Sequence, residues 1–291
     1  MDLPIVVGVD GSEPSLRAVD WAADEAALRG APLRLVYASL WDRYEGALLA
    51  QELGEPAEEV MAQDVVGVAR HRARHRRPEV EVTTGVLAEE PEHGLVHESR
   101  SALAVVLGCR GRSAISEALL GSVSLSVAGH GHCPVIVLRG SHDNQARSGT
   151  RGRILLGVGV KPAGSERVRF ATEEAVLRGV HLEALCAWRR PAHATTAHPL
   201  VVGEPVHADE RRAVEAVEEA LRDVPAGLRV HRQVVEGHAR DALVAASYEA
   251  DLLVVGARRR HGPFGHQLGR VAHGVLHHAA CPVAVVPEPS H

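Results

Sequence analysis

The sequence predicts two tandem α/β domains, each a doubly wound, five-stranded parallel sheet of order 3-2-1-4-5 with helices on both faces. Three observations predict this fold. The chain repeats itself at about half its length of 291 residues. In each half, short apolar segments alternate with helix-like segments, as in folds built from βαβ units. The apolar segments are almost continuously hydrophobic, which is typical of parallel strands covered on both faces.

The internal repeat is visible without gaps near the start of each half. Val6 to Ala38 (VVGVDGSEPSLRAVDWAADEAALRGAPLRLVYA) aligns with Leu155 to Ala187 (LLGVGVKPAGSERVRFATEEAVLRGVHLEALCA), and the match resumes near the end of each half. A polar segment rich in small residues separates the copies, which is typical of a flexible linker. We therefore predict a first domain over residues 1–140, a linker over 141–152 and a second domain over 153–291.

The elements of the first copy follow from local signals. An apolar strand over residues 5–9 precedes Ser12, which with Pro14 is typical of a helix start, and Gly30 is typical of a helix end. Helical spacing gives this first helix an apolar face of Leu16, Val19, Ala23, Ala26 and Ala27. The other expected elements are strands over 33–38, 80–86, 102–108 and 134–139, and helices over about 56–77, over 91–102 and from Gly121 onward.

A glycine-rich segment, Gly108 to Ser124 (GCRGRSAISEALLGSVS), follows the fourth strand with the spacing Gly-x2-Gly-x9-Gly-Ser. Gly108 and Gly111 allow the backbone to turn tightly and to approach a ligand. Gly121 opens a helix whose free N–H groups and positive end favour an anion, and the serines of its first turn add donors. Asp10 ends strand one, which flanks the same crevice in the predicted strand order. The pattern predicts a site for a phosphate chain.

Together these features resemble the universal stress protein family, in its tandem form with an ATP-binding first domain. The resemblance covers nearly the whole chain, through the VVGVDGS opening, the glycine-rich loop and the HCPVIVLR ending. It implies that the first domain holds an adenine nucleotide, namely ATP with or without Mg²⁺, and that the protein is a regulatory sensor of the stress response. The site residues that it implies are Val9, Asp10, Ala38, Gly108, Gly111, Arg112, Gly121, Ser122, Val123 and Ser124.

The resemblance also implies how domains associate. The strand-five segments, residues 134–138 and 282–286, match the edge through which such domains pair antiparallel. The two copies of this chain would most simply pair with each other. A homodimer and regulatory protein partners are further expectations.

The second copy departs from the motif of the first. Asp10 is replaced by Gly159, Gly111 by Arg259, Ser122 by Arg270 and Ser124 by Ala272. Loss of the aspartate removes a polar anchor, and Arg259 places a bulky side chain where the backbone approaches the ligand. The second domain is then either a structural or regulatory partner, or a site where Arg258 to Arg260 and Arg270 bind another anion.

Composition excludes several other classes. The net charge of −5 and the pI of about 6.4 give no basic field for nucleic acid or an anionic membrane surface. No apolar stretch approaches the ~18 residues of a membrane span. The four cysteines form no close pair and the start of the chain lacks a leader pattern, so a cytoplasmic location is expected. The nineteen histidines lack metal-site spacing, and we expect no metal site.

Two further functions remain open. The first copy contains no lysine for the β- and γ-phosphates, so any ATP hydrolysis should be weak. The alternative is a slow ATPase or a phosphoryl-transfer enzyme that uses Glu117 and Arg112. A second alternative is an interaction protein without a nucleotide. The motif also leaves open ATP against ADP, AMP or a cyclic dinucleotide.

Overall fold

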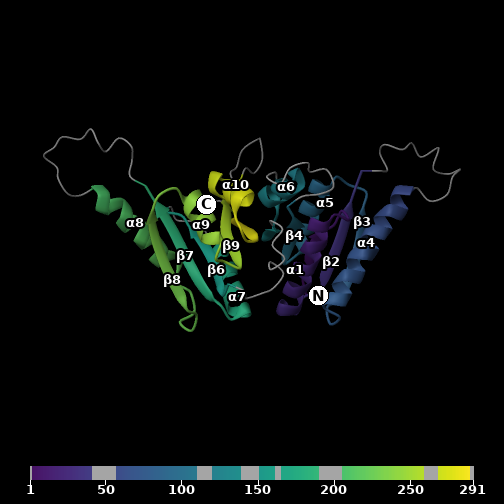
Figure 1. Cartoon of the computed structure of the whole chain (residues 1–291), viewed down its shortest axis with the longest axis horizontal. Coiled ribbons are helices and arrows are strands. Elements are labelled where there is room, and N and C mark those ends of the chain that lie inside the picture. The colour runs from purple at the N-terminus through teal and green to yellow at the C-terminus, as the bar shows by residue number, and fades with distance from the viewer. Residues whose placement is uncertain are drawn as a thin grey trace. The chain divides into compact units, whose positions relative to one another are not determined.

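The computed structural model describes residues 2–40, 57–109, 120–138, 151–160, 165–189, 205–258 and 268–288. It consists of two compact units (Figure 1). The first unit contains strands β1 to β5 and the second contains β6 to β10. The predicted pair of tandem α/β folds is confirmed.

The first domain is built on a parallel sheet in which the strands follow the order β3-β2-β1-β4-β5, as predicted. The core strands are apolar on both faces, and the side chains of residues 5–7 are 0% exposed. Strand β3 begins later than predicted because Val80 closes a turn, its N–H donating to the Arg77 carbonyl at 3.2 Å. The strands are β1 (Ile5–Gly8), β2 (Leu33–Ala38), β3 (Val82–Leu87), β4 (Ala104–Gly108) and β5 (Val135–Leu138).

Helices cover both faces of this sheet, α1 and α4 together on one and α5 and α6 together on the other (Figure 1). Arg72 of α4 holds Asp20 of α1 with two hydrogen bonds of 2.6 and 2.8 Å, so charged pairs join the outer sides of these two helices. The helices are α1 (Glu13–Arg29), α4 (Ala57–Arg76), α5 (Pro91–Glu98), the 3-10 helix η1 (Ser99–Ser101) and α6 (Ser122–His130).

Helix α1 begins and ends at the predicted residues. The Ser12 side chain caps its start by accepting a hydrogen bond from the Ser15 N–H at 3.4 Å. Gly30 ends it in the left-handed conformation, with φ of 63°. The predicted apolar face is partly wrong, since Leu16 and Ala27 are only half-buried.

Helix α1 contains a buried glutamate, a residue type that is usually exposed. Glu25 is 2% exposed and pairs with Arg29 one turn later. The second domain repeats this arrangement, because Glu174 is 0% exposed and Arg178 donates to it at 2.8 Å. A pair at this spacing on a helix is usually a surface feature. Here both carboxylates are buried, and each is held by the arginine of its own helix.

The second domain has the same strand order as the first, β8-β7-β6-β9-β10, and all its pairings are parallel. Its central strand is fully buried over residues 154–156. The strands are β6 (Arg153–Val158), β7 (His181–Trp188), β8 (Val230–Glu236), β9 (Leu252–Arg258) and β10 (Val283–Glu288). The helices are α7 (Glu166–Arg178), α8 (Pro205–Ala220), α9 (Ala239–Ser247) and α10 (Arg270–His278).

The cysteines and histidines of the described residues form no metal cluster with acidic neighbours. All four cysteines are buried free thiols, as small apolar residues would be. Burial raises the pKa of the Cys133 thiol, and that of the Cys281 thiol, to about 12. No helix within the described ranges combines the length and apolar character needed to cross a bilayer.

Candidate functional site

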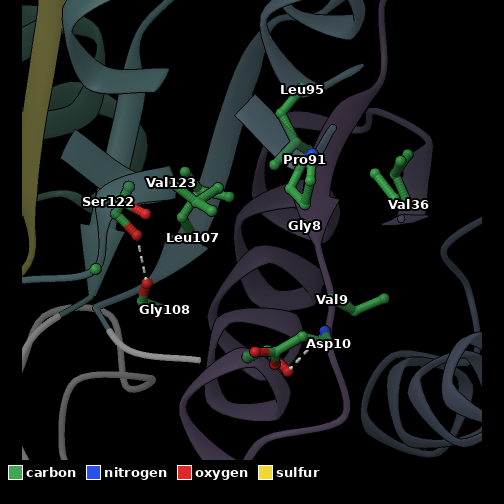
Figure 2. A pocket seen from close by; sticks show the side chains of 14 residues that line it. Gly8, Val9, Asp10, Val36, Pro91, Leu95, Leu107, Gly108, Ser122 and Val123 are labelled. Carbon is green, nitrogen blue, oxygen red and sulfur yellow. Dashed lines mark hydrogen bonds between the residues drawn. The ribbon is translucent and has the colours of Figure 1, made fainter. Parts of the chain in front are cut away.

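The first domain has a cavity of about 310 Å³ at the carboxyl edge of its sheet (Figure 2). This edge is the expected place for a ligand, because β1 and β4 are neighbours whose connections leave on opposite faces of the sheet. The volume of the cavity is at the lower end of the range for small-molecule sites. The lining residues are Gly8, Val9, Asp10, Ser15, Val36, Ala38, Pro91, Leu95, Leu107, Gly108, Gly121, Ser122, Val123 and Ser124.

The structure brings together the predicted site residues that it describes. Val9, Asp10 and Ala38 reach the cavity from the ends of β1 and β2, and Gly108 reaches it from the end of β4. The N-cap and first turn of α6, residues 121–124, also line it. Gly111 and Arg112 lie outside the described residues.

Asp10 is anchored at the start of α1. Its Oδ1 accepts hydrogen bonds from the Ser12 N–H at 3.0 Å and from the Ser12 hydroxyl at 2.6 Å. Its own N–H donates to Ser15 Oγ at 3.4 Å. Within the described chain Oδ2 has no hydrogen-bond partner, so the fixed carboxylate presents one acceptor to a ligand in the cavity.

The start of α6 forms the polar end of the cavity. Gly121 is its N-cap, with φ of −65° and ψ of 147°, and no side chain caps this helix. The first hydrogen bond of the helix is donated by the Leu125 N–H to the Gly121 carbonyl at 3.1 Å. The N–H groups of Ser122, Val123 and Ser124 therefore have no acceptor among the described residues, and with the helix dipole they favour an anion.

The two serine hydroxyls have partners that the sequence did not predict. Ser124 is 4% exposed and donates to the Gly108 carbonyl at 2.8 Å, so it ties α6 to the end of β4 rather than pointing a donor at a ligand. The exposed Ser122 donates to Glu92 Oε1 at 3.3 Å. Sequence reasoning missed Glu92. The signal that could have found it is its place just after Pro91, which opens the helix that follows β3.

The structure gives a steric reason for glycine at position 108 in addition to the expected approach to a ligand. A Cβ at this position would lie 2.7 Å from the carbonyl carbon and oxygen of Pro14 and 3.0 Å from the Ser15 nitrogen. The backbone of α1 therefore approaches Gly108 closely, while Gly108 also lines the cavity. Gly108 allows the end of β4 and the start of α1 to meet.

Replacing Gly108 with alanine should destabilise the first domain by about 1–3 kcal/mol, because backbone atoms cannot rotate away from the added methyl group. Gly67→Ala is the matched control. Gly67 lies inside α4, where an added Cβ would have no atom within 4 Å, and alanine there should stabilise by roughly 0.5–1 kcal/mol. Urea unfolding measures both, and equal effects of the two substitutions would contradict the steric account.

Apolar side chains form the walls of the cavity between Asp10 and α6. Val36 comes from β2, Leu107 from β4, and Pro91 and Leu95 from α5, and none of the four was predicted (Figure 2). Ala38 adds a small side chain that faces α5, where a Cβ on Gly94 would lie 3.6 Å away. An apolar slot with a fixed acceptor and an anion-binding helix start suits a flat base joined to a phosphate.

The corresponding edge of the second domain carries different chemistry. Gly159 follows β6 where Asp10 follows β1, and Arg270 and Ala272 replace the two serines at the helix start. Arg240, in the first turn of α9, is the counterpart of Glu92. Its side chain lies against α10, because a Cβ on Gly274 would be 2.5 Å from Arg240 Cδ. A carboxylate and a hydroxyl are thus replaced by two guanidinium groups. Arg259 lies outside the described residues.

In the second domain, a buried ion pair lies beside Gly256, the counterpart of Gly108. Arg167 of α7 donates to Glu288 at the end of β10 at 2.9 Å, and their side chains are 7% and 3% exposed. A Cβ on Gly256 would lie 3.1 Å from Glu288 Cγ and 3.2 Å from Arg167 Cδ. Burial raises the pKa of the Glu288 carboxyl, and Arg167 opposes this shift. Among the described residues, the atoms nearest to a Cβ on Gly256 belong to side chains.

Comparison with known proteins agrees with the repeat and the fold. A model of the universal stress protein family matches residues 3–139 and 150–287. A universal stress protein of Mycolicibacterium smegmatis is 32% identical over 301 residues, covering 97% of this chain and 96% of that protein. One from Mycobacterium tuberculosis is 31% identical over 300 residues, covering 97% of this chain and 96% of its own.

A solved structure of similar length agrees with the fold. The crystal structure of a universal stress protein from Archaeoglobus fulgidus aligns with a TM-score of 0.72 at 16% identity, covering 98% of both chains. A universal stress protein solved in complex with cAMP covers 48% of this chain and 98% of its own at 27% identity, with a TM-score of 0.37. The sequence repeat, the strand order of each half and the matches to full-length relatives lead to one conclusion. The chain belongs to the universal stress protein family and carries two of its domains in tandem.

Proposed function

We propose that the first domain binds one adenine nucleotide, and that its occupancy is the signal by which this protein takes part in a stress response. One observation carries the proposal. A single cavity joins an apolar slot to the fixed Asp10 carboxylate and to the uncapped start of α6. The slot suits the adenine base, Asp10 suits a hydroxyl of the ribose, and the α6 amides suit the phosphates. ATP is the proposed ligand, with Mg²⁺ as its counterion.

Binding is proposed for the first domain alone. The second domain lacks the anchoring carboxylate, and its helix start carries Arg270 in place of Ser122. We assign it a structural or regulatory role. Regulation is favoured over catalysis because none of the described cavity residues is a lysine, an arginine or a histidine that could stabilise a transferring phosphoryl group. Pairing through strand five, a homodimer and the cytoplasmic location stay predictions from the sequence.

Calorimetric titration of the full chain should give a stoichiometry of about one ATP per chain, because only one of the two domains carries the site. Mass spectrometry of the ligand released from denatured protein identifies the nucleotide that is bound in the cell. Arg270→Ser in the second domain is the control and should leave the stoichiometry unchanged. Two equal sites, or no binding of any adenine nucleotide, would overturn the proposal.

A further inference from the structure

Glu92 is not among the residues that line the cavity, but it lies next to them at the start of α6. It is half-buried in the first turn of α5, and its Oε1 accepts the hydrogen bond from Ser122 Oγ at 3.3 Å. Its chain neighbour Pro91 and its partner Ser122 both line the cavity. The carboxylate therefore stands beside the α6 start, which is the anion-binding end of the site.

This carboxylate and a phosphate oppose each other electrostatically. Both groups are negative and both only accept hydrogen bonds, so they cannot pair directly at the start of α6. No lysine, arginine or histidine is found among the described residues that line the cavity. The described part of the site therefore lacks a positive side chain that would separate the two negative groups.

The two domains also differ in charge at this place. Arg240 of α9 occupies the position of Glu92, and Arg270 occupies the position of Ser122. The second domain thus carries positive charge where the first carries a carboxylate and a hydroxyl. The carboxylate of Asp241, next to Arg240, is paired with that arginine at 2.8 Å, whereas Glu92 accepts only from the neutral Ser122 hydroxyl among its described hydrogen bonds.

A hard divalent cation resolves the conflict. Mg²⁺ is typically held by one or two carboxylates together with phosphate oxygens and several waters. Building on the proposed function, we propose that Glu92 makes binding of the phosphate tail depend on a divalent cation, so that the first domain selects the nucleotide as its cation complex. Glu92 is then a specificity-determining residue, and the cation bridges its carboxylate and the phosphates.

The test measures ATP affinity of the full chain by calorimetry, with Mg²⁺ and again with EDTA, for the wild type and for Glu92→Gln. The wild type should bind about 10-fold more tightly with Mg²⁺, as expected for a partly screened charge pair. Glu92→Gln should reduce this ratio to about twofold, by weakening binding with Mg²⁺ and tightening it in EDTA. Adenosine, which has no phosphate, should bind equally to both proteins in both conditions.

Glu81→Gln is the matched control, because Glu81 is an exposed carboxylate that precedes β3, at the opposite edge of the same sheet. It should keep the wild-type ratio. If Glu92→Gln tightens ATP binding by the same factor with and without metal, Glu92 only competes with phosphate and the proposal is wrong. If Glu92→Gln keeps the wild-type ratio of ATP affinities with Mg²⁺ and with EDTA, the proposal for Glu92 is wrong, but the proposed nucleotide binding still holds. Failure of the wild type to bind either ATP or adenosine overturns the proposed function as well.

Discussion

Arg167→Met is expected to destabilise the second domain by about 3–5 kcal/mol, because it leaves the Glu288 carboxylate buried without its counter-charge. Arg167 Nη1 lies 2.9 Å from Glu288 Oε1, and both side chains are more than nine-tenths buried. The pair is imperfectly satisfied, since Arg167 Nε and Glu288 Oε2 have no hydrogen-bond partner among the described residues. Replacing both members by apolar side chains, in Arg167→Met with Glu288→Leu, should therefore recover most of the lost stability.

The loss should depend on pH in a defined direction. Burial already raises the pKa of Glu288 in the folded state, and removing Arg167 raises it further. A carboxyl with a raised folded pKa favours folding when protonated, and this contribution is lost as pH rises through the folded pKa. The variant should be close to wild type at low pH, where the carboxyl is neutral, and weakest at neutral pH. Urea unfolding at pH 5 and pH 8 measures this, and an equal loss at both values would contradict the account.

In EDTA, where no divalent cation can bridge carboxylates and phosphates, Ser122→Asp should remove binding of phosphate-bearing nucleotides while the protein stays folded. The position is exposed and is the first residue of α6, where a carboxylate suits the helix dipole. A second carboxylate beside Glu92, at the proposed phosphate end of the site, should cost about 2.7 kcal/mol against a phosphate, or roughly 100-fold in affinity. Calorimetry with ATP and with adenosine measures it, and adenosine binding should be nearly unchanged.

Ser122→Asn separates charge from shape in this experiment. Asparagine is close to aspartate in size but neutral, so ATP affinity should change by less than about fivefold if charge is what matters. Equal losses for the two substitutions would mean that the side chain blocks the cavity sterically. Full ATP affinity in Ser122→Asp would mean that the phosphates do not bind at α6.

The fold was accessible from the sequence because its signals are local and occur twice. Each element is specified by its own residues, such as the apolar strand segments, the Ser12 cap and the Gly30 helix end. The second half of the chain repeats the pattern and so supports the same assignment. The cavity followed from strand order and glycine spacing. Gly111 and Arg112 lie outside the described residues, so their place in the site stays a prediction.

The remaining features depend on tertiary packing. Glu25 and Glu174 look like ordinary helical surface charges, because the spacing of a glutamate and an arginine one turn apart is the same in water and in a core. The steric need for glycine at position 108 comes from the backbone of α1, which packs against it, and this contact cannot be read from the sequence. The contact of Glu92 with Ser122 depends on the packing of α5 against α6, which the local sequence does not specify.

The burial of two thiols has a consequence for their reactivity toward oxidants. With the pKa of Cys133 and of Cys281 raised to about 12, both sulfurs remain protonated throughout the cellular pH range. Peroxide reacts with the ionised form, so these two positions resist oxidation to sulfenic acid. Direct peroxide sensing by this chain, if it occurs, would have to use groups other than these two thiols.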